Sequence, residues 1–160
     1  MIKNIPFIIL LVITISCGFK PIHKLSDTNK SDGIYKVKIL NNVAREISEE
    51  ISNNIINSNE DTKYTAMLTV NQNLTPLIVN TNGTVAKYRI EISISYELID
   101  NETSERLTVG NARGFAQYDI GASEINNEDT KKSMIKIATK NAIQLMTTKI
   151  QNDISNKNDN

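Results

Sequence analysis

Few of the residue types that build reactive centres occur in this chain of 160 residues, which has one Cys, one His and no Trp. A zinc site of Cys and His ligands needs several such side chains and a disulfide needs two Cys, so both are excluded within the chain. A catalytic Cys–His pair would have to be Cys17 with His23, six residues apart in a segment with the composition of a tether. The sequence therefore favours a protein that is not an enzyme.

No charge of either sign dominates, because 18 basic and 18 acidic side chains give a formal net charge of zero. Binding along a nucleic-acid backbone needs a basic surplus, so we expect no nucleic-acid partner. The length and the 39% share of hydrophobic residues describe one small globular domain at most.

The longest apolar run stands near the N-terminus, after Lys3. It spans Ile5 to Ile15 and is interrupted only by Pro6 and Thr14. As a helix it would measure about 16 Å, roughly half of the hydrocarbon core of a bilayer. Its length is typical of a signal-peptide core and too short for a membrane span.

A cysteine directly follows this run. The sequence Ile15-Ser16-Cys17 resembles the lipobox of bacterial lipoproteins, although Thr14 stands where Leu is commonest. The resemblance implies a signal peptide over residues 1–16 and lipidation at Cys17 by diacylglycerol and an N-acyl chain, with no further cofactor. Each buried CH₂ of such an anchor contributes about 0.8 kcal/mol. A secretory signal with an incidental Cys, or a buried apolar segment, are the alternatives.

The lipidated Cys and a flexible tether are expected over residues 17–33, because the stretch from Lys24 to Gly33 has a single large apolar side chain. The domain proper is expected over residues 34–154. A short strand over 35–39 opens it, and a helix follows. The helix has its apolar side chains within an arc of about 120°: Val43, Ala44, Ile47, Ile51 and Ile55. Asn42 is its predicted N-cap.

Three strands are expected next, without a helix between them. The first begins at Tyr64, and its alternation is clear to Asn71. The second has the clearest period of two in the chain, with an apolar set from Tyr88 to Leu98. A polar turn over 100–104 leads to a return strand from Arg106 to about Tyr118. That strand carries a row of small residues on which a helix could pack closely, with a bulge predicted near Gly110.

A long helix from about Glu128 to Ile154 ends the domain, with Asn127 as its predicted cap and a disordered tail over 155–160. Its predicted apolar stripe contains Met134, Ile135, Ala138, Ala142, Leu145, Met146 and Ile150. The element order predicts an α+β two-layer sandwich, in which two helices pack on one face of a four-stranded, mainly antiparallel sheet. The other sheet face is expected to be polar.

The segment after the lipobox is more specific. Cys17-Gly18-Phe19-Lys20-Pro21-Ile22 resembles the mature start of the alphaproteobacterial LPS-assembly lipoproteins (LptE). The return strand agrees with that family through Arg113-Gly114-Phe115-Ala116 and Tyr118, followed by an Ala-containing helix. The departures are Lys, Thr and Asn in place of Ala in that helix, and Ile22-His23 where Leu-Tyr is more usual.

The resemblance implies a function for which composition alone gives no indication. LptE proteins plug the outer-membrane β-barrel LptD, assist its assembly, and bind lipopolysaccharide on its way to the cell surface. The implied partners are LptD, lipopolysaccharide and outer-membrane lipid. Gly18 in place of Asp after the Cys implies the outer membrane, on its periplasmic side. Another lipid-anchored binding module, such as an auxiliary lipoprotein of a different envelope transporter, is the alternative.

Basic side chains that could bind the phosphates of lipopolysaccharide lie on the polar face of the predicted hairpin. The candidates are Lys87, Arg89, Arg106 and Arg113. The alternative is a solvated strand face, because Glu91 and Glu97 alternate with them in sign.

Two further features remain open at the level of the sequence. The apolar segment 77–79 is a loop or a short edge strand, which would contact a barrel wall or lipid, or fold back onto the core.

A periplasmic hydrolase is the least favoured function, since no Gly-x-Ser-x-Gly elbow is present and Glu49 and Glu50 would diverge around a helix.

Overall fold

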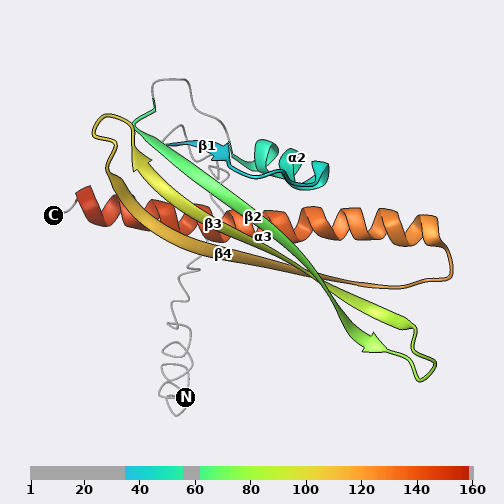
Figure 1. Ribbon diagram of the computed structural model, residues 1–160. Coiled ribbons are helices and arrows are strands. Elements are labelled where there is room, and N and C mark those ends of the chain that lie inside the picture. Colours follow the sequence, from blue (N-terminus) through green and yellow to red (C-terminus); the bar gives the residue numbers. More distant parts are fainter. Residues whose placement is uncertain (1–34, 56–61, 159–160) are drawn as a thin grey trace, which may run out of the picture.

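The computed structural model describes residues 35–55 and 62–158, and Figure 1 shows their arrangement. The predicted signal peptide, Cys17 and the tether lie outside the described residues. The elements are β1 (Tyr35–Ile39), α2 (Arg45–Asn54), β2 (Tyr64–Val79), β3 (Val85–Asp100), β4 (Arg106–Asp119) and α3 (Glu124–Asn158).

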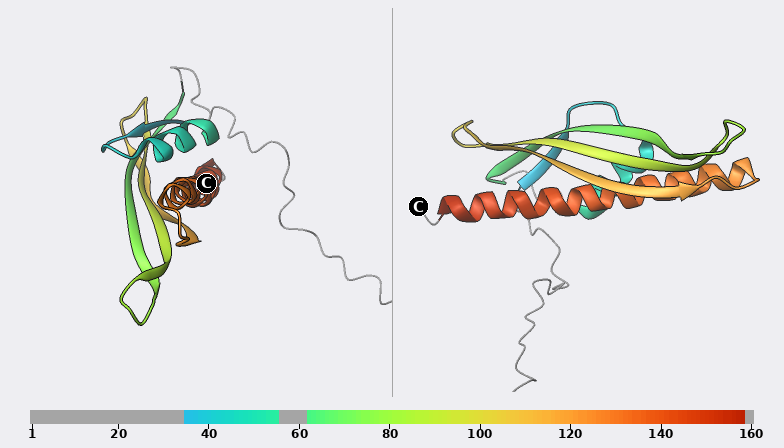
Figure 2. Two further views of the ribbon diagram at one scale, coloured as in Figure 1. Left: turned by 90° about the vertical axis from the view of Figure 1, so that its right-hand side faces the viewer. Right: turned by 90° about the horizontal axis from the view of Figure 1, so that it is seen from below.

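The strands form one sheet in the order β1-β2-β3-β4. The β1 strand is parallel to β2, and the other two pairings are antiparallel. Both helices cover the same side of this sheet, as the left view of Figure 2 shows. The predicted α+β two-layer sandwich with a mainly antiparallel sheet is therefore confirmed.

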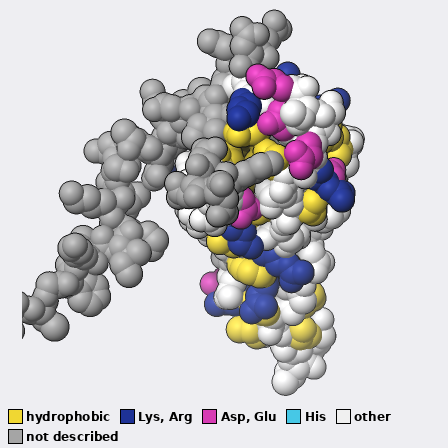
Figure 3. Space-filling model, turned by 90° about the vertical axis from the view of Figure 1, so that its left-hand side faces the viewer, with side chains coloured by type: hydrophobic (Ala, Val, Ile, Leu, Met, Phe, Trp, Pro, Cys, Tyr) yellow, Lys and Arg dark blue, Asp and Glu magenta, His cyan; other side chains and the backbone are white. Residues whose placement is uncertain are grey.

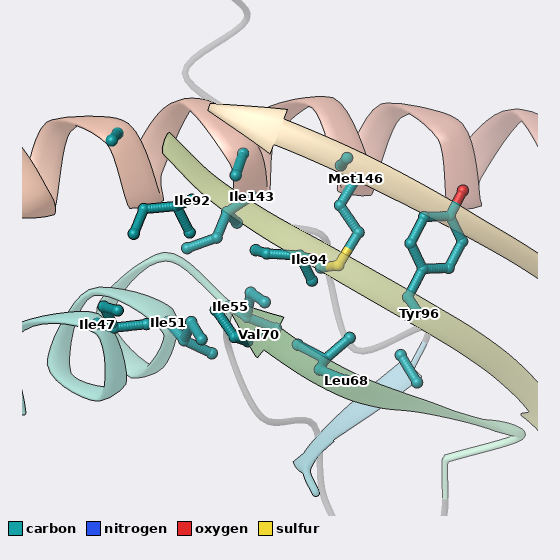
Figure 4. Packing of buried hydrophobic residues seen from close by; sticks show 14 of the residues in the cluster. Ile47, Ile51, Ile55, Leu68, Val70, Ile92, Ile94, Tyr96, Ile143 and Met146 are labelled. Atoms are coloured by element: carbon teal, nitrogen blue, oxygen red, sulfur yellow. The ribbon is translucent and has the colours of Figure 1, made fainter. Parts of the chain in front are cut away.

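The core lies between the sheet and the helices. The period-two pattern of β3 determines its sheet side, because Ile90, Ile92, Ile94 and Leu98 are fully buried. It receives Ile47 and Ile51 from α2, Ile55 from the residue that follows this helix, and Ile143 and Met146 among others from α3. Figure 4 shows these side chains meeting over β2 and β3. Burying one such side chain contributes about 1.5–3 kcal/mol. The predicted helix stripes are confirmed apart from Leu145, which is exposed, and Val43 and Ala44, which precede the first residue of α2.

A row of small residues lets α3 approach β4 closely. Ala112, Gly114 and Ala116 point inward, and a Cβ at Gly114 would collide with the backbone of Ala138 and Ala142 in α3. The close-packed helix predicted for this row is thus confirmed, and no larger side chain fits between the two backbones.

The bulge in β4 lies elsewhere than predicted. Leu98 is opposite Thr108 and Ile99 is opposite Arg106, so Leu107 is the extra residue and Gly110 stays in register with Tyr96. Gly110 has a different role, because a Cβ there would collide with the Tyr96 ring. The shift at Leu107 lets this side chain pack on the core while Val109 points outward.

The N-cap predicted for α2 is wrong. The helix begins at Arg45, after Ala44, and no side chain caps it. The neighbouring Asn41 binds the sheet instead, since its Nδ2 donates to the Val70 carbonyl (2.8 Å) and its Oδ1 accepts from the Val70 N–H (3.0 Å). The amide side chain therefore continues the β1–β2 ladder beyond the end of β1.

The bounds of α3 also differ from the prediction. It begins at Glu124, and the side chain of Asn127 binds the backbone N–H (2.8 Å) and carbonyl (3.0 Å) of Gly121 instead of capping the helix. At the other end the helix continues through Asn158, where a disordered tail was predicted. No Gly or Pro interrupts the chain after Ile154, and Ser155 Oγ donates to the Gln151 carbonyl.

The edge strand β4 is bonded along its open side by side chains of α3. Lys149 Nζ donates to the Asn111 carbonyl (2.8 Å), and Asn141 Nδ2 donates to the Phe115 carbonyl (3.3 Å). These carbonyls would otherwise be free to pair with another strand.

Candidate functional site

The sheet face opposite the helices, hereafter the outer face, carries the predicted basic residues. Its centre is made of small polar side chains, and Asn111 Nδ2 donates to Ser93 Oγ (2.9 Å) and Ser95 Oγ (3.2 Å) across the β3–β4 pair. Val109 and Phe115 are the exposed large apolar side chains on β4. The outer face is thus largely polar, as predicted.

Three of the four candidate basic residues are paired with carboxylates. Lys87 lies 3.2 Å from Asp119, Arg106 lies 2.9 Å from Glu97, and Arg113 lies 3.6 Å from Glu91. Each pair joins β3 to β4 across the outer face. Such exposed pairs contribute about 0–1 kcal/mol to stability.

The fourth, Arg89, is exposed and stands opposite Thr75 of β2 and Gln117 of β4. Within the part of the chain that the structure describes, it is the one candidate without a carboxylate partner at ion-pair distance. Its guanidinium therefore keeps all its donors for an external anion.

The candidates do not form a single patch. Lys87 and Arg89 are neighbours on one face of β3, whereas Arg106 stands opposite Ile99. Ten residues of strand separate Arg89 from Ile99, which is about 33 Å. Arg113 lies between them, opposite Ser93. Together with the carboxylates they form a row of alternating sign, so Lys87 and Arg89 are the pair best placed to act together.

The segment 77–79, whose structure the sequence left open, is the end of β2. The register shifts between Pro76 and Val79, and Ile78 and Val79 are 49% and 57% exposed. Folding back onto the core is therefore not observed. Figure 1 shows this end of the β2–β3 hairpin extending beyond the helices. The sequence also contains no charged residue between Lys63 and Lys87, a signal that would have predicted an unusual environment for this hairpin.

Among the described residues, no group of three or more His, Cys, Asp or Glu side chains could hold a metal ion. Within residues 35–55 and 62–158, no helix is both long and apolar enough to cross a membrane.

The sequence itself matches no protein-family model. No curated protein matches it either. The fold, in contrast, is one that solved bacterial proteins share, and those described below are called lipoproteins.

A protein of Caulobacter crescentus described as a lipoprotein superposes with a TM-score of 0.61 at 12% identity, covering 78% of this chain and 93% of that one. Rare lipoprotein B of Shewanella oneidensis gives a TM-score of 0.53 at 11% identity, with 77% and 98% covered. Lipoprotein B of Nitrosomonas europaea gives 0.52 at 13% identity, with 70% and 77% covered. At these identities the likeness establishes the fold.

Proposed function

We propose that this protein is an outer-membrane lipoprotein of the LptE kind, without enzymatic activity. It is anchored through lipid on Cys17 at the periplasmic side, plugs and helps to assemble the LptD β-barrel, and takes part in lipopolysaccharide transport. The observation that carries the proposal is a fold shared with solved bacterial lipoproteins, in a chain whose N-terminus resembles a lipobox.

The outer face supports a position inside a barrel. The lumen of a wide outer-membrane barrel is polar. A sheet face with hydrogen-bonding Ser93, Ser95 and Asn111 at its centre suits such a wall. The charged side chains around this centre also suit a polar surface, because Arg106 is paired with Glu97 and Arg113 with Glu91.

Arg89 and Lys87 are the residues that we assign to lipopolysaccharide, with Arg106 and Arg113 as weaker candidates. A phosphate accepts two parallel hydrogen bonds from one guanidinium. Arg89 offers that geometry without first breaking an ion pair, whereas Arg106 and Arg113 must leave Glu97 and Glu91.

The test is affinity purification of the tagged full-length protein from detergent-solubilised membranes of its own source. We expect LptD to co-purify, and depletion of the protein to lower surface lipopolysaccharide. Recovery as a lone monomer would contradict the proposal. Recovery with a different envelope transporter would favour the alternative, an auxiliary lipoprotein of that transporter.

A further inference from the structure

The distal end of the β2–β3 hairpin, residues 77–86, hereafter the hairpin tip, is exposed and carries no charge. The uncharged stretch runs from Tyr64 to Ala86 in a chain in which 22% of residues are charged. Water-facing hairpins normally carry Lys or Glu for solubility. An uncharged tip with exposed Ile78 and Val79 is instead suited to a surrounding of low polarity.

Two further exposed apolar side chains lie at the same end of the molecule. The Ile120 N–H donates to the Ala86 carbonyl (2.9 Å), which fixes the β4–α3 connection beside the hairpin. Ile120 is 37% exposed, and Ile125 at the start of α3 is 77% exposed. Figure 1 and the right view of Figure 2 place this connection and the hairpin tip at one end. Apolar surface from two connections therefore converges there.

Several polar groups of the turn at the tip are paired within the turn. The Asn80 N–H donates to the Thr84 carbonyl (2.8 Å), and the Gly83 N–H to the Asn80 carbonyl (2.9 Å). Asn80 Nδ2 donates to Thr84 Oγ1 (3.0 Å), and the Thr84 N–H to Asn82 Oδ1 (3.1 Å). Each donor and acceptor that is already paired within the turn lowers the free-energy cost of moving the turn out of water.

Basic side chains stand directly behind the tip. Lys87 is opposite Ile78, and Arg89 follows on the same face. With Asp119 beside Lys87, they leave one net positive charge at the base of the uncharged tip. Figure 3 shows basic side chains among hydrophobic ones in the lower part of the molecule, while most acidic ones in that view lie higher. This order matches a bilayer surface, in which phosphates lie outside the acyl chains.

We propose that the hairpin tip inserts into the boundary between headgroups and acyl chains of a lipid bilayer, with Ile78 and Val79 among the chains and Arg89 at the phosphates. Ile78 is level with Lys87, about 7 Å beyond Arg89 along the strand, and Val79 is opposite Val85, about 13 Å beyond Arg89. With Arg89 at the phosphates, Ile78 falls within the depth of about 5–10 Å to which interfacial segments are buried. The proposal does not depend on a barrel partner.

The absence of Trp from the chain makes insertion measurable. In the purified full mature protein, Ile78→Trp supplies a single Trp at the tip, and Gln144→Trp places a matched one on the exposed side of α3. Both are added to vesicles of phosphatidylethanolamine and phosphatidylglycerol with bromine on the acyl chains. We expect a blue shift and quenching of most of the fluorescence for Ile78→Trp, and neither for Gln144→Trp. Val79→Trp repeats the measurement should Ile78→Trp disturb the strand.

The outcomes separate lipid from other occupants. Equal emission from Ile78→Trp, Val79→Trp and Gln144→Trp would overturn the proposal. A blue shift that occurs only with a co-reconstituted barrel, and without bromine quenching, would mean that the tip docks on protein and would overturn it too. Adding Arg89→Gln to Ile78→Trp should reduce the quenching on these anionic vesicles, and by less on pure phosphatidylcholine, whose phosphates carry no net headgroup charge. A failed purification of LptD would leave these measurements unaffected, so the two proposals fail separately.

Discussion

At the scale of single residues, Arg89 differs from the other basic side chains of the outer face because its guanidinium is exposed and stands beside uncharged Thr75 and Gln117. We expect Arg89→Gln to weaken lipopolysaccharide binding about tenfold. That factor corresponds to roughly 1.4 kcal/mol, near the lower end of what a hydrogen bond to a charged group contributes. Titration calorimetry with the purified protein measures it.

Arg106→Gln is the matched control for this prediction, because Arg106 is already paired with Glu97 and lies at the other end of the outer face. Arg106→Gln should bind lipopolysaccharide nearly as tightly as the parent protein does. Equal losses in the two variants would indicate binding through overall charge rather than through the Arg89 guanidinium.

Gly114 sets the distance between the two layers. We expect Gly114→Ala to lower the free energy of unfolding by about 1–3 kcal/mol, because the new methyl group must push α3 away from β4. Urea denaturation followed by circular dichroism measures the change.

Gly121→Ala is the control for the same chemical change. The nearest atom to a Cβ at Gly121 is Asn127 Oδ1 at 3.6 Å, an ordinary contact. The urea concentration at the unfolding midpoint of Gly121→Ala should lie close to that of the parent protein. If both variants unfold at the same urea concentration, the layers are not held at contact distance by Gly114.

At the scale of elements, Asn41 continues the short strand β1 with a side chain. We expect Asn41→Ala to lower the free energy of unfolding by about 1–3 kcal/mol, since two hydrogen bonds to Val70 are lost. Hydrogen exchange checks the location of the effect, because the Val70 amide should exchange faster.

Asn42→Ala changes the adjacent residue, which is exposed and was predicted to cap the helix. It should leave both the stability and the Val70 amide unaffected. A destabilisation by Asn42→Ala that exceeds that of Asn41→Ala would restore the capping role.

Elements with a long uniform period could be predicted from the sequence, and those defined by one contact could not. The β3 alternation and the buried row of α3 follow from spacing alone, because burial selects one face. Asn41, Asn42 and Asn127 are all plausible caps by residue type. Which of them binds a helix end and which binds a strand or loop depends on tertiary neighbours that spacing does not indicate.

The extent of the β2 strand likewise could not be predicted from its own sequence. Its alternation is clear only to Asn71, and the sequence left segment 77–79 open as a loop or a short edge strand. In the structure Pro76 is tolerated because β1 pairs with β2 only as far as Leu68, which leaves Pro76 on an open edge. The extent of β2 thus depended on the length of a different strand.

At the scale of the whole molecule, the proposed anchor joins the domain to a membrane through Cys17. We expect Cys17→Ser to abolish both the cleavage of residues 1–16 and the added lipid mass, and the protein to lose its stable attachment at the outer membrane. Mass spectrometry of the intact protein and density fractionation of membranes measure the two effects. A parent protein recovered at full length and without lipid would contradict the proposed localisation.

The candidate site was only partly predictable at this scale. The strand period placed Lys87 and Arg89 on one face, and the structure has them there. Which basic residues lie near carboxylates depends on the β3–β4 register, and the bulge at Leu107 brings Arg106 opposite Ile99, within reach of Glu97. A period of two fixes the face of a side chain but not its partner.

The contacts that Lys149 and Asn141 make to β4 have a consequence for self-association. Open sheets polymerise when free edges of two copies join. In this protein side chains of α3 bind two carbonyls of the β4 edge, and Pro76 removes a donor on the part of β2 that lies beyond its pairing with β1. Growth of the sheet into a fibre is thereby hindered along β4 and at Pro76 on the part of β2 that β1 leaves open.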